Sequence, residues 1–219
     1  IHIVACGTSY HAGLVGRYLI EDWARIPVHV EVASEYRYRT CLAGPGDLVI
    51  GITQSGETAD TLAAMRVARE RGAHVVALTN IMGSQATRDA DGVLYTRAGL
   101  EIGVAATKTH TAQVMALSLL ALKLGRLKWA LTAAGALDLA EELRRVPSVL
   151  EEYLASPAPA AVVRAAEKYA DRSFFLYLGR HVGVPVCFEG ALKLKEISYI
   201  PTEAYPAGEM KHGPIALLE

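Results

Sequence analysis

The sequence has 219 residues, of which 52% are hydrophobic and 21% are charged, and its formal net charge is −1. This length suits one large domain, or one domain with part of another, and the apolar share excludes a disordered chain. A near-neutral charge offers no basic surface that could follow a phosphate backbone, so the composition disfavours nucleic acid as a partner.

The first part of the chain alternates short β-rich runs with helical patterns. Strands separated by helices of this length indicate βαβ units and a parallel sheet, and continuous apolar strands fit a sheet covered on both faces. We therefore predict an α/β fold, a three-layer doubly wound parallel sheet. The expected strands are residues 1–5, 28–33, 47–53, 73–79 and 92–95, and the expected helices are residues 10–25, 58–71 and 107–124.

The composition changes in the second half of the chain. Residues 130–155 are rich in Ala, Leu and Glu and predict a helix, as do residues 160–170. The segment between them, SPAP at residues 156–159, is the best candidate for a linker because of its two prolines.

A strand–glycine–helix order occurs at the start of the chain and again near its end. Residues 173–178 predict a strand, and a helix follows from about residue 184. Any two βα units share such a pattern, so a second, related α/β unit and a chance likeness both explain it. We expect a first domain at residues 1–130, a helical connector at 131–170 and the truncated start of a second domain at 171–219.

The spacing of the cysteines and the length of the apolar segments indicate the cellular compartment of the protein. Cys6, Cys41 and Cys187 form no CxxC pair, so neither a zinc site nor a disulfide framework is expected, which fits a reducing cytoplasm. No apolar run reaches the ~20 residues that span a bilayer. We therefore expect a cytoplasmic protein with no metal, no other cofactor and no membrane partner.

A polar loop, TQSGET at residues 53–58, follows the third expected strand and leads into a helix. A helix N-terminus presents free N–H groups and the positive end of the macrodipole, so it attracts anions. The loop contains a glycine that lets the backbone approach a ligand, and it contains no Lys or Arg. It matches neither a P-loop nor a dinucleotide fingerprint, and it can hold a phosphate dianion by neutral donors. Those donors are Thr53, Gln54, Ser55 and Thr58.

The same residues also fit an ordinary capped helix, with Ser55 as the N-cap. A second polar loop favours a binding site, because Thr8 and Ser9 follow the first strand and begin a helix. In a parallel sheet both loops lie at the carboxyl edge, where ligands bind. The two loops can therefore face one ligand from two sides.

Six sequence motifs, which include these two loops, occur in order along the chain. They are CGTS at residues 6–9, SEYRYR at 34–39, QSGETADT at 54–61, EIGVAATK at 101–108, EGALKLKEISY at 189–199 and EAYPAGEMKHGP at 203–214. Together they resemble the isomerase half of the glucosamine-6-phosphate synthase family, the glutamine–fructose-6-phosphate aminotransferases. The resemblance runs the length of the chain.

The resemblance implies two sugar isomerase (SIS) folds in tandem, the first complete and the second truncated. It implies fructose 6-phosphate as substrate, ammonia derived from glutamine, and glucosamine 6-phosphate as product. The family often has Ser where this chain has Thr53, and the hydroxyl group is kept. By match to the family, the phosphate is held by Thr53, Gln54, Ser55 and Thr58, Thr8 and Ser9 lie near the sugar, and Val104 and Ala106 line the sugar site.

The reaction implied moves a proton between C1 and C2 of the sugar, which needs a general base with a pKa suited to neutral pH. Glu196 matches the family's base, and Lys193 shares its helix face and can stabilise charge on the sugar oxygens. His212 matches the histidine that opens the sugar ring and that the family supplies across a dimer interface. Without the resemblance, Lys193 and Glu196 would be interpreted as a surface ion pair, and His212 as a histidine of a loop.

Other polar residues read as structural. Glu101 and Lys108 flank the start of the helix expected at 107–124, and we assign both to that helix start. Cys6 has no clear base in the sequence, so packing is its expected role. The histidines without metal-ligand spacing are expected to be structural or on the surface, and they include His11, His29 and His110.

The chain begins without Met inside an expected strand, so we expect a piece of a longer protein. Against the family, it lacks the N-terminal glutaminase domain, the rest of the second SIS unit and the C-terminal tail whose lysine forms a Schiff base with the open sugar. We therefore expect this chain alone to form no glucosamine 6-phosphate, and the whole protein to be a homodimer.

Two alternative functions share the phosphate loop. One is a stand-alone SIS phosphosugar isomerase or deglycase, which has no glutaminase domain upstream. The other is a non-catalytic sugar-phosphate-sensing module, which needs residues 53–58 but neither Glu196 nor His212.

Overall fold

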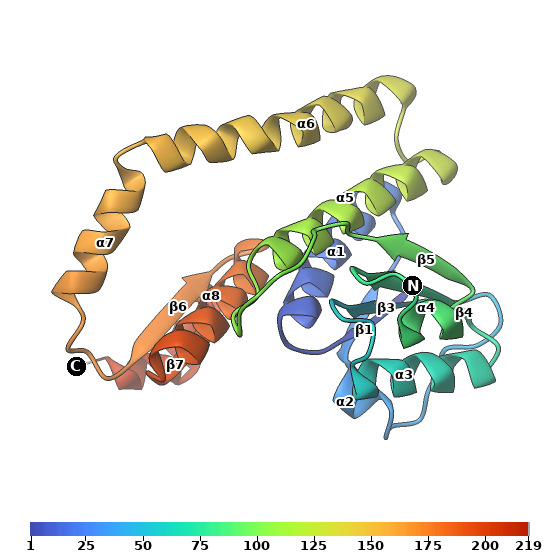
Figure 1. Ribbon diagram of the computed structural model, residues 1–219, viewed down its shortest axis with the longest axis horizontal. Helices are drawn as coiled ribbons and strands as arrows, with labels where there is room; N and C mark the ends of the chain where they lie inside the picture. The colour runs from blue at the N-terminus through green and yellow to red at the C-terminus, as the bar shows by residue number, and fades with distance from the viewer. Residues whose placement is uncertain (219) are drawn as a thin grey trace.

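The centre of the molecule is a five-stranded parallel sheet with the strand order β2-β1-β3-β4-β5 (Figure 1). This computed structural model describes residues 1–218. The strands lie close to the predicted positions and are β1 (His2–Ala5), β2 (His29–Val32), β3 (Leu48–Thr53), β4 (His74–Thr79) and β5 (Gly92–Tyr95).

Helices cover both faces of this sheet, because alternate strand residues point to opposite sides. Ile3 and Ile50 face a core shared with α1 (Gly7–Ala24) and α5 (Lys108–Leu127). Val4 and Val49 face the other core, which is shared with three helices. The predicted three-layer doubly wound sheet is therefore confirmed. The helices of the second core are α2 (Ala33–Tyr36), α3 (Ala59–Glu70) and α4 (Gln85–Asp89).

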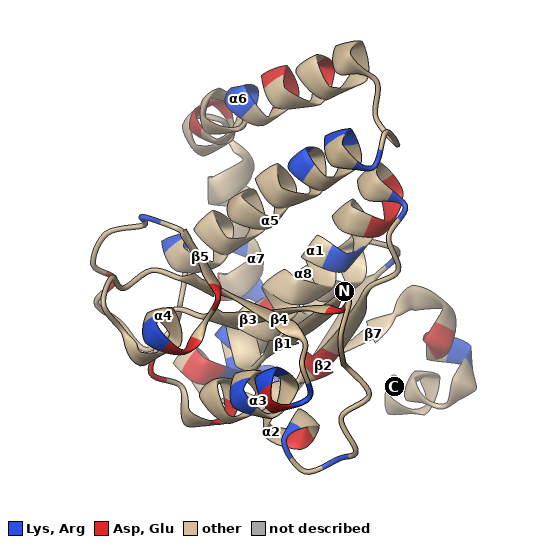
Figure 2. Cartoon of the chain, turned by 90° about the vertical axis from the view of Figure 1, so that its right-hand side faces the viewer, with Lys and Arg blue, Asp and Glu red and all other residues tan. Residues whose placement is uncertain are grey.

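Helices α1 and α5 approach each other closely. A Cβ atom on Gly16 would lie 2.9 Å from Cδ1 of Leu117, so a larger residue there would force the Leu117 side chain to shift. Helix α3 carries acidic and basic residues along its length, as Figure 2 shows, and its Arg66, Arg69 and Glu70 are exposed. The helical patterns of the sequence thus follow the burial of each helix.

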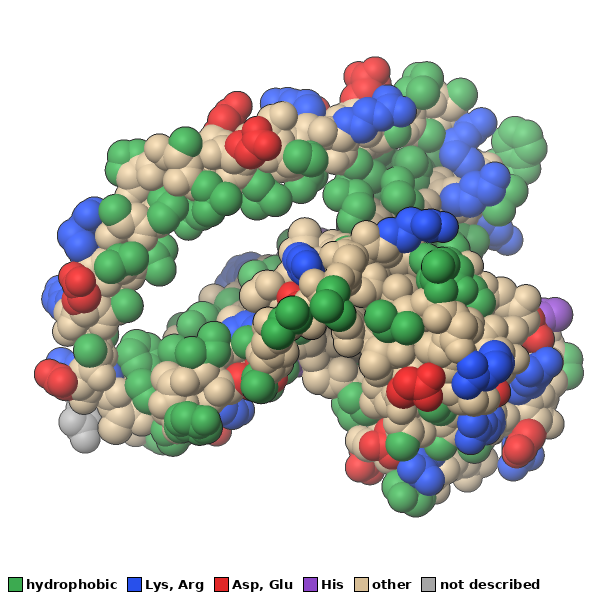
Figure 3. Space-filling model, in the orientation of Figure 1, with side chains coloured by type: hydrophobic (Ala, Val, Ile, Leu, Met, Phe, Trp, Pro, Cys, Tyr) green, Lys and Arg blue, Asp and Glu red, His purple; other side chains and the backbone are tan. Residues whose placement is uncertain are grey.

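Helices α6 (Ala133–Ala155) and α7 (Ala158–Lys168) form an arm that stands away from the sheet (Figure 1). The predicted linker at 156–159 is partly wrong, because α7 already begins at Ala158. Proline is tolerated in the first turn of a helix, where its missing N–H has no partner to lose. The side of the arm that faces the body carries apolar side chains (Figure 3). The exposed apolar residues of the two helices include Leu150, Leu154, Val162 and Val163.

The last part of the chain is a βαβ unit. Strands β6 (Phe175–Gly179) and β7 (Thr202–Pro206) pair in parallel, and α8 (Gly183–Ser198) connects them. Helix α8 packs against α1, so this unit lies beside the five-stranded sheet (Figure 1). Two 3₁₀ turns follow, Ala207–His212 and Pro214–Leu217. The division into domains at 1–130, 131–170 and 171–219 stays a prediction.

The elements that were not predicted are α2, α4, β7 and the two 3₁₀ turns. Helices α2 and α4 are four and five residues long, which is too short for a helical period to repeat. Within residues 1–218, none of the helices combines the length and the apolar character that crossing a membrane requires.

Candidate functional site

Two polar loops meet at the carboxyl edge of the sheet, as the sequence predicted. Strands β1 and β3 are neighbours, and their register pairs Ala5 with Ile52, so both strands end at the same level. The first turn of α1, with Thr8, therefore lies beside the loop at residues 53–58. This edge is where ligands bind in open parallel sheets.

The loop at residues 53–58 is held by its own hydroxyl groups. The Oγ1 atoms of Thr53 and Thr58 lie 2.8 Å apart, and the Gly56 N–H donates to Thr53 Oγ1 at 3.2 Å. The Glu57 N–H donates to Ser55 Oγ at 3.1 Å. Ser55 is therefore not the N-cap of α3, because that helix begins at Ala59 and Thr58 precedes it.

Gly56 allows this loop to turn tightly against its neighbours. Its φ of 70° lies in the left-handed region, which favours glycine. A Cβ atom there would lie 2.0 Å from the Ser84 hydroxyl oxygen, so any other residue would displace the segment in front of α4. The Gly56 carbonyl also accepts from the Ala86 N–H at 2.9 Å. The loop is thus fixed before any ligand binds, which lowers the cost of ordering it.

A second wall of the site comes from the segment between β5 and α5. A small cavity of about 110 Å³ lies where this segment approaches Gln54. Val104 and Ala106, two predicted site residues, line it. Gln54, Val104 and Ala106 therefore line one cavity, whereas Thr53, Ser55 and Thr58 are not among its lining residues, and the binding roles of all six stay predictions.

Glu101 fixes that segment to the start of α5. Its Oε1 atom accepts from the Thr107 N–H at 2.8 Å, the Thr107 hydroxyl at 2.8 Å and the Lys108 N–H at 3.1 Å, and Oε2 accepts from the Thr109 hydroxyl. Burial raises the pKa of Glu101, but these hydrogen bonds outweigh it and lower the pKa to about 2. The predicted role of Glu101 at a helix start is confirmed, and Glu101 caps that helix from six residues upstream of Thr107.

The predicted catalytic pair lies on α8, and it reaches the first loop. Lys193 Nζ is 2.6 Å from Glu196 Oε2 and donates to Thr8 Oγ1 at 3.0 Å. Glu196 Oε2 is buried and, apart from this close ion pair, no well-aligned hydrogen-bond donor reaches it within residues 1–218. Lys193 thus contacts both Glu196, three residues further along α8, and Thr8, which is 185 positions away in the sequence.

Glu189 also contacts Lys193 and Thr8, and it was not among the predicted site residues. The residue is 8% exposed, and its carboxylate lies 3.4 Å from Lys193 Nζ and accepts from Thr8 Oγ1 at 3.0 Å. Burial raises its pKa, but the hydrogen bond from His11 and the nearby Lys193 outweigh it, so the pKa is lowered. A spacing of four residues to Lys193 was the one available signal.

Two predicted site residues make no contact with Lys193 or Glu196 among the hydrogen bonds and ion pairs of residues 1–218. Ser9 is buried, and its hydroxyl accepts from Gln113 Nε2 of α5 at 3.0 Å, so it braces the two helices. His212 ends an exposed 3₁₀ turn, and no hydrogen bond or ion pair within residues 1–218 joins it to Lys193 or Glu196. The roles assigned to these two residues stay predictions.

Comparison with known families and structures agrees with this geometry. The SIS domain family matches residues 1–123. The glutamine–fructose-6-phosphate aminotransferase [isomerizing] of Thermus thermophilus is 52% identical over all 219 residues, and that of Pseudomonas putida is 54% identical over 220 aligned positions. The chain spans 36% of the length of each of these relatives.

Solved structures of similar proteins also match this chain. The C-terminal domain of glucosamine-fructose-6-phosphate aminotransferase from Francisella tularensis superposes with a TM-score of 0.95 and 42% identity, over 100% of this chain and 61% of that one. A Clostridium difficile structure named as a putative phosphosugar isomerase shares the fold, with a TM-score of 0.88 and 22% identity over 100% of this chain and 62% of that one. Because the family match covers more than half of the chain, the chain belongs to the SIS domain family.

Proposed function

We propose that the protein containing this chain is a glutamine–fructose-6-phosphate aminotransferase, and that this chain carries its sugar-phosphate isomerase site. The proposed substrate is fructose 6-phosphate and the proposed product is glucosamine 6-phosphate. The names of the similar proteins support this proposal, as does the position of the polar loops at the sheet edge.

The observation that carries the proposal is the contact of Lys193 with both Glu196 and Thr8. Glu196 is a carboxylate within 2.6 Å of an ammonium group, in a partly buried position beside the first polar loop. A base at that place can move a proton between two neighbouring sugar carbons. The Lys193 ammonium can stabilise the negative charge that develops on the sugar oxygens during this step.

The loop at residues 53–58 is the proposed phosphate site. Its donors are neutral, and the N-terminus of α3 behind it supplies the positive end of a helix dipole. We assign the phosphate to Thr53, Gln54, Ser55 and Thr58, and the sugar to Thr8, Ser9, Val104 and Ala106. The phosphate thus anchors one end of the substrate while Lys193 and Glu196 act on the other.

Further parts of the proposal depend on the whole protein. We assign ring opening to His212 of a second copy, which makes a homodimer necessary for activity. A glutaminase domain would supply the ammonia, and the protein would be cytoplasmic. Neither a metal nor another cofactor is needed, because this reaction uses only proton transfers and the transferred amino group.

Two measurements on the full-length protein test the proposal. Calorimetry should detect fructose 6-phosphate binding and no binding of unphosphorylated fructose at the same concentration. Incubation with fructose 6-phosphate and glutamine should form glucosamine 6-phosphate. Equal binding of the free sugar would exclude the phosphate loop as the anchor, and binding without product would favour a sensing module.

A further inference from the structure

His11 contacts the proposed catalytic cluster from the opposite helix. It lies on α1, and its Nδ1 atom is 2.7 Å from Glu189 Oε2 on α8. Both side chains are largely buried, at 14% and 10% exposure. Because the Glu189 pKa is lowered and an ionised carboxylate only accepts hydrogen bonds, the histidine nitrogen donates.

Glu189 in turn competes for the lysine of the cluster. Lys193 Nζ lies 3.4 Å from Glu189 Oε1 and 2.6 Å from Glu196 Oε2, so one ammonium stands between two carboxylates. These three groups carry two negative charges and one positive charge. A buried carboxylate that lacks a hydrogen-bond donor destabilises the fold, so Glu189 requires donors from its other neighbours.

His11 provides such a hydrogen-bond donor. Its donor occupies Oε2, while Thr8 and Lys193 approach Oε1. Without the histidine donor, Oε2 would be an unsatisfied buried acceptor, and Lys193 is the nearest cation that could satisfy it. The ammonium would then move toward Glu189 and away from Glu196.

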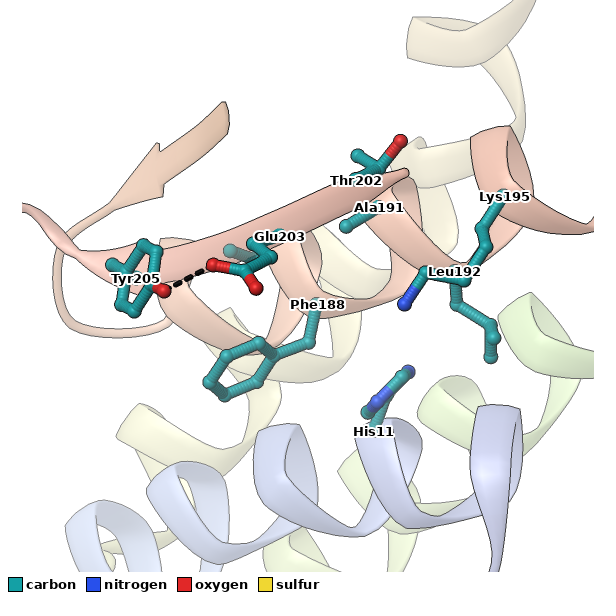
Figure 4. A pocket seen from close by; sticks show the side chains of 9 residues that line it. His11, Phe188, Ala191, Leu192, Lys195, Thr202, Glu203 and Tyr205 are labelled. Atoms are coloured by element: carbon teal, nitrogen blue, oxygen red, sulfur yellow. Dashed lines mark hydrogen bonds between the residues drawn. The ribbon is translucent and has the colours of Figure 1, made fainter. Parts of the chain in front are cut away.

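Other polar and aromatic groups surround the histidine ring, and Figure 4 shows the ring rising from α1 toward α8. It lines a pocket of about 310 Å³ with Phe188, whose ring centre lies 5.9 Å away. The ionisable groups around His11 include Tyr10 on α1, Glu189, Lys193 and Lys195 on α8, Glu203 and Tyr205 on β7, and His110 on α5. Of these, Glu189 is the group that His11 binds directly.

We propose that His11 is a positioning residue, which satisfies Glu189 and so leaves Lys193 in contact with Glu196. This inference rests on the proposed function, because it assigns Lys193 and Glu196 to the reaction. It goes beyond the structural or surface role that the sequence suggested for His11. It also predicts that the hydrogen-bond donor of His11 matters and that its aromatic ring does not.

Two substitutions separate the donor from the ring. His11→Phe keeps a ring against Phe188 and removes the donor, whereas His11→Asn removes the ring and places an amide N–H where Nδ1 was. Both are made in the full-length protein, together with His74→Phe and His74→Asn as matched controls. His74 is exposed at the start of β4, away from this cluster.

The rate of glucosamine 6-phosphate formation and its dependence on fructose 6-phosphate are the measurements. We expect His11→Phe to lower kcat about ten- to a hundredfold, since a hydrogen bond to a charged group is lost. KM should stay within about twofold, because the phosphate loop lies on other elements. His11→Asn should keep kcat within about threefold of the wild type, and both His74 variants should match the wild type.

Several results would overturn the inference. They are an unchanged kcat in His11→Phe, a change in KM alone, or an equal loss in His11→Asn, which would make ring packing the cause. Melting temperature and fructose 6-phosphate binding confirm that each variant is folded. If His11→Phe does not fold, His11→Ala, which adds no bulk, replaces it. A wild-type protein that forms no product would instead refute the proposed function.

Discussion

The hydroxyl groups of Thr53 and Thr58 lie 2.8 Å apart and join the last residue of β3 to the residue that precedes α3. This bond closes the polar loop on itself. Thr53 is only 2% exposed, yet its hydroxyl also accepts from the Gly56 N–H. One side chain thus fixes both the turn and the donors that we assign to the phosphate.

Thr53→Val should therefore weaken both the fold and the binding of ligand. Valine has the same shape but no hydroxyl, so the Gly56 N–H loses its acceptor and Thr58 loses its partner. We expect the free energy of unfolding to fall by about 1–2 kcal/mol and the affinity for fructose 6-phosphate to fall at least about tenfold. Urea unfolding and calorimetry measure these two quantities.

Thr53→Ser is the matched control, because it keeps the hydroxyl and removes only a methyl group. It should bind fructose 6-phosphate within about threefold of the wild type. If Thr53→Val bound as tightly as Thr53→Ser, the hydroxyl would have no part in holding the phosphate.

The sequence predicted those features of the site that depend on local order. The loop at 53–58 follows a strand and precedes a helix within a dozen residues, so its position at the sheet edge follows from the βαβ pattern. The helix face shared by Lys193 and Glu196 follows from a spacing of three residues.

The sequence could not predict the contacts that depend on packing between distant helices. His11 and Glu189 are 178 positions apart, and they meet only because α8 packs against α1. Nothing in the histidine's neighbourhood in the sequence marks it as the partner of a buried carboxylate. The burial of Ser9 against Gln113, 104 positions away, has the same cause.

Glu101→Gln should destabilise the protein in a pH-dependent manner. The folded-state pKa of Glu101 is about 2, below the ordinary value of 4.5, so its ionised form stabilises the fold. This contribution is fully present above pH 4.5 and is lost as the pH falls through 2. At neutral pH we expect the substitution to cost about 1 kcal/mol, the usual effect of losing a helix cap.

Chemical unfolding of wild type and Glu101→Gln between pH 2 and 6 tests this expectation. Other carboxylates titrate in both proteins, so their effect cancels in the difference. That difference should shrink toward zero as the pH approaches 2. Glu141→Gln, an exposed position on α6, should match the wild type throughout. A constant difference across this range would show that the charge of Glu101 is not what the helix start requires.

Glu196→Gln in the full-length protein should separate chemistry from binding. Glutamine has the same shape as glutamate but cannot accept the sugar proton, so kcat should fall about 10²- to 10⁴-fold. Calorimetric affinity for fructose 6-phosphate should change less than about threefold, because residues 53–58 are intact. Glu70→Gln, an exposed position at the end of α3, is the control for a lost negative charge. Because a sugar-phosphate sensor has no need of a base, full activity in Glu196→Gln would remove this residue from the mechanism and leave the phosphate loop as the functional part of the site.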